Sequence, residues 1–180
     1  MTDQTPGSAD PLALSGVIPP TLTVFDDDET VDYEATVAHA AFTVDRDCDA
    51  VFTLGTNGEF TLLTPEERQR VVERVTDAVD DVPVLAGVGA PGTRQTVRYA
   101  EHAADAGADG LIAVTPFYFP LDDEGAVEHY RRVAAAVDCP VYVYQIPSHA
   151  GTTLSLSAVD RIAAIAGVAG LKHTRSLIHI

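Results

Sequence analysis

The feature that most constrains this chain is a regular alternation of short apolar runs with amphipathic segments, repeated about every 30 residues. The apolar runs are continuous rather than mixed with polar residues. In the segments between them, apolar residues recur at the spacing of one helix face. Continuous apolar strands that alternate with amphipathic helices predict a parallel sheet covered by helices.

The pattern predicts six strands and five intervening helices. The predicted strands span residues 17–25, 50–54, 83–88, 110–115, 140–144 and 168–172. The predicted helices span residues 32–44, 65–79, 94–106, 123–137 and 157–166. The second helix carries three start signals: Thr64 as the N-cap, Pro65 at the first position and Glu67 completing a capping box. Ser157 is the expected cap of the last helix.

Two α/β architectures compete for this pattern. A doubly wound sheet normally carries a glycine-rich nucleotide turn after its first strand, whereas the acidic run Asp26–Glu29 follows the first strand here and would repel phosphate. A (β/α)8 barrel gathers its chemistry at the carboxyl ends of its strands. Unusual polar residues follow four different predicted strands, namely Thr56-Asn57, Tyr118, Tyr144 and Lys172. The expected fold is therefore a (β/α)8 TIM barrel.

The length suggests that the barrel is partial. A whole barrel takes about 250 residues, and this chain of 180 residues supplies about six βα units. A truncated barrel is favoured over an open sheet, because an open edge leaves backbone groups and apolar surface exposed. Residues 1–14 are rich in proline, serine and aspartate and are expected to form a mobile tail, ahead of one partial-barrel domain at 15–180.

The charge balance limits the partners. The chain has 27 acidic and 11 basic residues, a formal net charge of -16, which argues against binding to nucleic acid or an anionic membrane. No apolar run approaches the roughly 20 residues of a membrane span, and the polar amino terminus lacks the apolar core of a signal peptide. The chain is expected to be soluble and cytoplasmic. Its acidic clusters and its preference for arginine over lysine suggest a protein solvated in high salt.

The cysteines and helical histidines give no sign of a metal or cofactor site. Cys48 and Cys139 lack CxxC spacing, so a disulfide or zinc site is not expected, and both are read as small buried residues. His39, His102 and His129 fall on predicted helices and are expected to be solvated or partly packed. No metal or cofactor is therefore expected.

Lys172 is the only lysine in the chain and ends the last apolar run. A lysine at the end of a buried strand is costly to keep. Apolar surroundings disfavour the ammonium form, and the free amine can attack a carbonyl carbon to form a Schiff base. The alternative is a lysine in a surface salt bridge.

A Schiff-base reaction also needs a proton shuttle. Tyr142 and Tyr144 are two apart on one strand and share a face. The Tyr144 phenol, whose proton can be relayed through hydroxyls, can act as general acid and base. Either tyrosine could instead be an aromatic residue of the core, and this alternative is stronger for Tyr142 than for Tyr144.

The turn Gly55-Thr-Asn-Gly-Glu59 follows the second predicted strand. Its backbone amides, around Thr56, Asn57 and Gly58, can point at an anion such as a substrate carboxylate, and Thr56 can pass a proton. An ordinary βα loop accounts for this composition equally well.

Five motifs in this order and spacing resemble the dihydrodipicolinate synthase/N-acetylneuraminate lyase family of class I, pyruvate-dependent (β/α)8 aldolases. They are Gly55–Phe60, Leu63–Arg68, Thr115–Phe119, Tyr144–Pro147 and Gly170–Lys172, within a resemblance covering about residues 15–175. The resemblance implies that Lys172 forms the Schiff base with pyruvate or a 2-keto acid and that Tyr144 transfers protons. It implies that Thr56 and Asn57 hold the keto acid's carboxylate, with Thr56 also in the relay. Tyr118 matches a tyrosine that crosses a dimer interface in many members, and members are typically homotetramers, as dimers of dimers.

Departures from the family pattern bear on the substrate. Dihydrodipicolinate synthases usually carry threonine at Asn57, asparagine at Gln145 and an arginine at His149 that holds the aldehyde's carboxylate. Loss of the arginine favours an aldolase that cleaves a 2-keto-3-deoxy sugar acid, such as 2-keto-3-deoxygluconate, to pyruvate and an aldehyde. His149 could hydrogen-bond a sugar hydroxyl or be an ordinary loop residue. The alternatives are a 4-hydroxy-tetrahydrodipicolinate synthase, a dehydratase, and a catalytically inactive truncated barrel.

Overall fold

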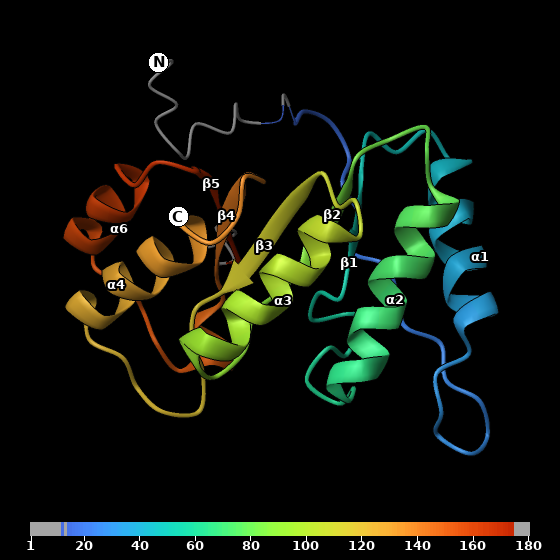
Figure 1. Ribbon diagram of the computed structural model, residues 1–180, viewed down its shortest axis with the longest axis horizontal. Helices are drawn as coiled ribbons and strands as arrows, with labels where there is room; N and C mark the ends of the chain where they lie inside the picture. The colour runs from blue at the N-terminus through green and yellow to red at the C-terminus, as the bar shows by residue number, and fades with distance from the viewer. Residues whose placement is uncertain (1–11, 13, 175–180) are drawn as a thin grey trace, which may run out of the picture. The chain divides into compact units, whose positions relative to one another are not determined.

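A computed structural model describes residue 12 and residues 14–174 (Figure 1). The expected tail at 1–14 falls almost entirely outside these residues. The strands follow one another in the sheet in chain order as β1 (Val51–Thr53), β2 (Val84–Gly87), β3 (Gly110–Val114), β4 (Val141–Gln145) and β5 (Val168–His173). The helices are α1 (Tyr33–Val44), α2 (Pro65–Ala78), α3 (Thr93–Asp105), α4 (Asp123–Ala134), α5 (Pro147–Ala150) and α6 (Leu156–Ala163). The predicted alternation of strands and helices is confirmed.

The predicted first strand, residues 17–25, is not a strand. It forms only isolated bridges, Pro20 to Phe52 in parallel and Phe25 to Val31 in antiparallel. The segment does run beside β1, because the N–H of Thr21 donates to the carbonyl of Phe52. Prolines at 19 and 20 have no N–H to donate, which interrupts the ladder. The described residues therefore contain five strands where the sequence predicts six.

The chain forms two compact units, and each is described by itself. The amino-terminal unit holds Leu12–Gly87 and Glu101–Leu111, and the carboxy-terminal unit holds Val88–Ala100 and residues 112–174 among those described. None of the helices in the described part of the chain is long and apolar enough to cross a membrane.

In the amino-terminal unit, β1 and β2 pair in parallel and are buried along their whole length. Helix α2 begins as predicted, since Thr64 and Glu67 form a reciprocal capping box with Pro65 at the start. Its face of valines and the buried Arg68 pack inward, and the Arg68 guanidinium donates to the carbonyl of Gly87 at 3.0 Å.

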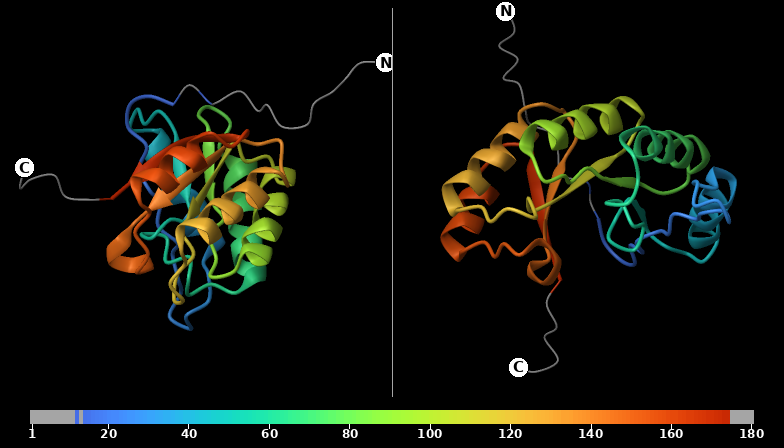
Figure 2. Two further views of the ribbon diagram at one scale, coloured as in Figure 1. Left: turned by 90° about the vertical axis from the view of Figure 1, so that its left-hand side faces the viewer. Right: turned by 90° about the horizontal axis from the view of Figure 1, so that it is seen from below.

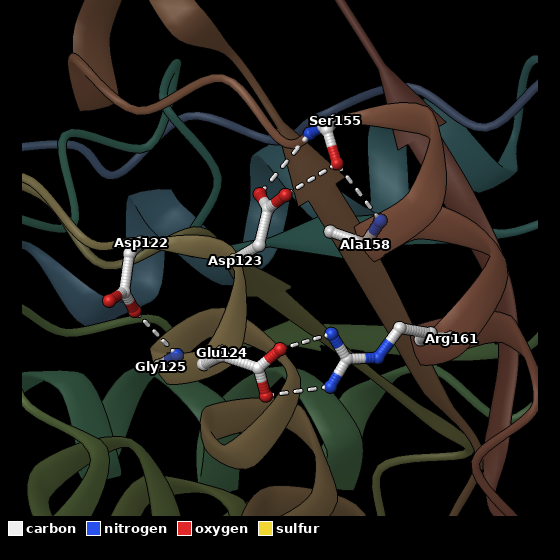
Figure 3. Close-up of polar contacts among 7 residues, drawn as sticks. All are labelled: Asp122, Asp123, Glu124, Gly125, Ser155, Ala158 and Arg161. Atoms are coloured by element: carbon white, nitrogen blue, oxygen red, sulfur yellow. Dashed lines mark hydrogen bonds and ion pairs between the residues drawn. The ribbon is translucent and has the colours of Figure 1, made fainter.

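In the carboxy-terminal unit, β4 and β5 pair in parallel, and α4 packs beside α6 (Figure 2). Helix α6 begins one residue before the predicted start, and its cap lies two residues before the expected one. Its cap is Ser155, whose hydroxyl accepts the N–H of Ala158 at 3.1 Å, and Ser157 lies inside the helix. Asp123 at the start of α4 accepts a 2.5 Å hydrogen bond from the Ser155 hydroxyl (Figure 3).

A second polar contact also joins α4 to α6. Glu124 and Arg161 form a two-pronged ion pair with distances of 2.5 and 2.8 Å (Figure 3). The short helix α5 was not predicted; Pro147 occupies its first turn, where a missing N–H costs nothing.

Candidate active site

Lys172 and Tyr144 lie directly opposite one another on neighbouring strands. The register of β4 and β5 pairs Tyr144 with Lys172, and the Nζ of Lys172 lies 3.8 Å from the centroid of the Tyr144 ring. Tyr144 is buried, at 5% exposure. Among the described residues, parallel pairing therefore joins the two side chains that the sequence predicts to carry the chemistry.

Lys172 is less buried than the sequence predicts. It is half-buried, and β5 as a whole is half-buried to exposed, whereas β1, β2 and β3 are fully buried. The reason is that β5 is the last strand of the described sheet and pairs only with β4.

Thr174 is a neighbour of this pair that the sequence reasoning missed. Its Oγ1 lies 3.2 Å from the Nζ of Lys172 and 3.4 Å from the phenol oxygen of Tyr144. The signal was available, because residues two apart on an extended chain point to the same side. The same alternation places Gln145 on the opposite face from Tyr144, and Gln145 is buried there at 4% exposure.

The turn after β1 is compact and strained at both ends. Leu54 and Glu59 adopt left-handed backbone conformations, with φ of 55° and 51°. The N–H of Gly58 donates to the carbonyl of Gly55, and the Gly58 carbonyl accepts the Thr23 hydroxyl at 2.7 Å. A Cβ at Gly58 would lie 3.1 Å from the carbonyl oxygen of Thr21, a tight contact that favours glycine.

Thr56 and Asn57 lie between the two strained ends of this turn. Thr56 is half-buried and Asn57 is exposed. Because the Gly58 N–H is already used inside the turn, an anion would meet the groups of the two preceding residues. These residues belong to the amino-terminal unit, whereas Tyr144 and Lys172 belong to the carboxy-terminal unit.

Tyr118 and His149 lie on exposed segments of the carboxy-terminal unit. Tyr118 is 85% exposed, has a left-handed φ of 78°, and packs edge to face on Phe119. His149 is exposed on α5, and its Nδ1 lies 2.9 Å from the Ser148 hydroxyl. No contact in the described residues joins either side chain to Lys172 or Tyr144.

Two titratable groups lie deep inside the carboxy-terminal unit. His129, expected to be solvated or partly packed, is instead 1% exposed, and its Nδ1 lies 2.9 Å from the Thr93 hydroxyl. Burial, aided by the positive charge of Arg132, lowers the pKa of His129 to about 4. Burial also raises the pKa of Tyr130, whose hydroxyl donates to the carbonyl of Ala113.

Neither Cys48 nor Cys139 forms a disulfide, and both are half-buried rather than fully buried. Within residue 12 and residues 14–174, no cluster of three or more histidines, cysteines or carboxylates could hold a metal ion.

The parallel strands follow one another in chain order and alternate with helices, which is the arrangement of an α/β barrel, whereas a doubly wound sheet reverses its strand order. Among solved structures, the chain is similar to the crystal structure of YagE from Escherichia coli K12, a prophage protein of the dihydrodipicolinic acid synthase family in complex with pyruvate. The TM-score is 0.88 and the identity 33%, over 93% of this chain and 57% of the other. This likeness confirms the expected fold class, part of a (β/α)8 barrel.

The family follows from the sequence match. A profile of the Dihydrodipicolinate synthetase family matches residues 13–179, and the chain belongs to this family. It is 62% identical to an uncharacterized DapA-like lyase of Halobacterium salinarum, over 93% of this chain and 55% of the relative.

Two further relatives carry different names. A 4-hydroxy-tetrahydrodipicolinate synthase of Natronomonas pharaonis is 40% identical over 88% of this chain and 54% of its own. A probable 2-dehydro-3-deoxy-D-pentonate aldolase of Escherichia coli K12 is 37% identical over 83% and 50%. The chain spans about half the length of the curated relatives it matches.

Proposed function

We propose that this protein is a lyase that binds pyruvate or a related 2-keto acid as a Schiff base on Lys172, with Tyr144 as the proton-transferring phenol. The observation that carries the proposal is the direct pairing of these two residues, with the amine 3.8 Å from the ring centroid. Lys172 is the only lysine, so no other side-chain amine is available for the reaction. A relative of the same fold is known in complex with pyruvate.

In the cleavage direction, the free amine of Lys172 attacks C2 of the keto acid, and loss of water leaves a protonated imine. The phenolate oxygen of Tyr144 takes the proton of the C4 hydroxyl as the C3–C4 bond breaks, and the electron pair moves into the imine. An aldehyde leaves. Tyr144 returns the proton to C3 of the enamine, and water then releases pyruvate and the free amine.

We assign the carboxylate of the keto acid to Thr56 and Asn57, and a part in proton transfer to Thr56. The assignment rests on the family motif and on the local strain of the turn, since left-handed non-glycine residues such as Leu54 and Glu59 concentrate at functional sites. Gly58 contributes shape rather than a donor, because its N–H is used within the turn.

For the 2-keto acid that is cleaved we propose a 2-keto-3-deoxy sugar acid, which yields pyruvate and an aldehyde. The absence of an arginine at His149 favours this choice, because an arginine is the natural two-pronged partner of an aldehyde's carboxylate. His149 is exposed and could contact a sugar hydroxyl. A 4-hydroxy-tetrahydrodipicolinate synthase is the second candidate, and the 40% identical relative of that name supports it equally.

We propose that the working form is a homo-oligomer to which Tyr118 contributes. A tyrosine that is 85% exposed and held in a left-handed conformation is suited to a role in another protomer's site. The acidic composition and a relative from Halobacterium support a protein that works in high salt.

Trapping with borohydride tests the Schiff base. The protein is incubated with pyruvate and sodium borohydride, and its intact mass is measured. We expect one adduct, which is absent from Lys172→Arg, a variant that keeps the charge but cannot form the imine. Absence of an adduct in the wild-type protein, or its persistence in Lys172→Arg, overturns the proposal. Absence of an adduct would favour the alternative of a catalytically inactive truncated barrel. Comparing glyceraldehyde with aspartate semialdehyde as the partner of pyruvate then decides between the two substrates.

A further inference from the structure

The hydroxyl of Thr174 joins the two side chains proposed to carry the chemistry. The Nζ of Lys172 donates to Thr174 Oγ1 at 3.2 Å, and Thr174 Oγ1 donates to the phenol oxygen of Tyr144 at 3.4 Å. Both bonds run in the same direction, from the amine through the hydroxyl to the phenol. The geometry therefore provides a continuous path for a proton between Lys172 and Tyr144.

The hydroxyl is not needed to hold the backbone in place. The N–H of Thr174 donates to the carbonyl of Gln145 at 3.0 Å, which extends the β4–β5 ladder by one residue. Any substitution other than proline keeps that bond. The Thr174 side chain is exposed, so its loss opens no cavity in the core.

The Lys172 amine needs a way to lose a proton. Attack on a carbonyl requires the neutral amine, so a Lys172 ammonium must give up a proton before it can react. Among the described residues, no carboxylate forms an ion pair with Lys172 and could take the proton. The acceptor that the structure places on Nζ is the hydroxyl of Thr174.

We propose that Thr174 is the hydroxyl through which Lys172 and Tyr144 exchange a proton, an inference that rests on the function proposed above. A proton leaves the Lys172 ammonium for Thr174 Oγ1 as the Thr174 hydroxyl proton moves to the phenolate oxygen of Tyr144. The products are a neutral amine and a neutral phenol, and the threonine is unchanged, so protons and charge balance. The phenol then protonates the hydroxyl that leaves as water when the imine forms. Thr174 is thus a positioning residue that acts through its two neighbours.

Two substitutions isolate the hydroxyl. Thr174→Val removes it and keeps the shape of the side chain, whereas Thr174→Ser keeps it. The rate of adduct formation with pyruvate and borohydride is measured across the neutral to alkaline range, with far-ultraviolet circular dichroism to confirm folding. We expect Thr174→Val to form the adduct about 100-fold more slowly at neutral pH and to recover at high pH, where hydroxide replaces the relay. Thr174→Ser should behave like the wild-type protein.

A double variant and a measurement without substrate test the proton relay through Thr174 independently of the proposed lyase function. Adding Tyr144→Phe to Thr174→Val should cost little more than either change alone, because residues that act as a unit are not additive. The pH profile for acetylation of Lys172, the only lysine, should move to lower pH in Thr174→Val, because the ammonium loses the acceptor that the Thr174 hydroxyl provides. This readout needs no substrate, and Thr174→Ala serves in it if the valine variant does not fold.

The outcomes distinguish the two ideas. No adduct in the wild-type protein overturns the proposed function, and the acetylation profile still reports on the hydroxyl. A wild-type adduct with an unchanged rate and profile in Thr174→Val overturns the relay and leaves the function standing. Equal loss in Thr174→Ser and Thr174→Val also overturns the relay, because shape rather than the hydroxyl then matters.

Discussion

Gly170 lies directly opposite Tyr142 in the β4–β5 ladder, and the tyrosine ring covers the space where a side chain at position 170 would stand. A Cβ at Gly170 would be 3.1 Å from Cδ1 and 3.3 Å from Cε1 of that ring. The register places this pair beside Tyr144 and Lys172. A side chain at position 170 would therefore require the Tyr142 ring to shift by a few tenths of an ångström.

Gly170→Ala should displace the Tyr142 ring and destabilise the protein by about 1–3 kcal/mol, the usual cost of an overpacked contact. Urea unfolding followed by circular dichroism measures the change. The control is Gly170→Ala made in a Tyr142→Ala background, where the ring that the added methyl group would meet is absent. An equal effect of Gly170→Ala in both backgrounds would show that the ring contact does not govern stability.

The cap of α6 gives a second prediction. Ser155 accepts the N–H of Ala158 and donates to Asp123, so Ser155→Ala loses a cap and a link to α4 (Figure 3). We expect a loss of about 1 kcal/mol. Ser157→Ala, inside the first turn, should be neutral or slightly stabilising because alanine is the better helix former. If Ser157→Ala lowers the melting temperature more than Ser155→Ala does, Ser157 rather than Ser155 is the cap.

The salt dependence of the melting temperature tests whether the acidic composition marks a protein adapted to high salt. A net charge of -16 is strongly self-repelling at low ionic strength. The screening length shrinks from about 30 Å in 0.01 M salt to about 3 Å in 1 M salt. We expect the melting temperature to rise by roughly ten degrees or more over this range, a shift of a few kcal/mol for a domain of this size. A melting temperature that is constant or falls with potassium chloride would contradict a high-salt protein.

The sequence predicted the helices and strands whose signals are local. The capping box at Thr64 and Glu67 is confirmed, because it depends only on residues three apart. The apolar runs that form β1 to β5 are confirmed because a run of consecutive apolar residues is itself a local pattern. The prediction of a strand at 17–25 was wrong. The residues there are apolar and β-branched, which favours a strand, but the missing N–H groups of Pro19 and Pro20 outweigh that preference.

The candidate site was predictable in its residue types and less so in its geometry. Strand alternation explains why Tyr142 and Tyr144 share a face, and parallel register adds Lys172 to that face. The half-exposure of Lys172 was not predictable, because it depends on which strand ends the described sheet. The burial of His129 was missed for a similar reason, since helical spacing shows which residues share a face and not how deeply that face is covered.

His129 therefore gives a prediction in pH. Its pKa is lowered to about 4 in the folded protein from an ordinary value of 6.5, so the unfolded chain binds the extra proton first. Its stabilising contribution is complete above pH 6.5 and is lost as the pH falls toward 4, in total by roughly 3 kcal/mol. Carboxylates also titrate in this window, so the measurement is the difference in unfolding free energy between the wild-type protein and His129→Gln. That difference should shrink or reverse as the pH falls, and parallel curves would mean that His129 is not held neutral by burial.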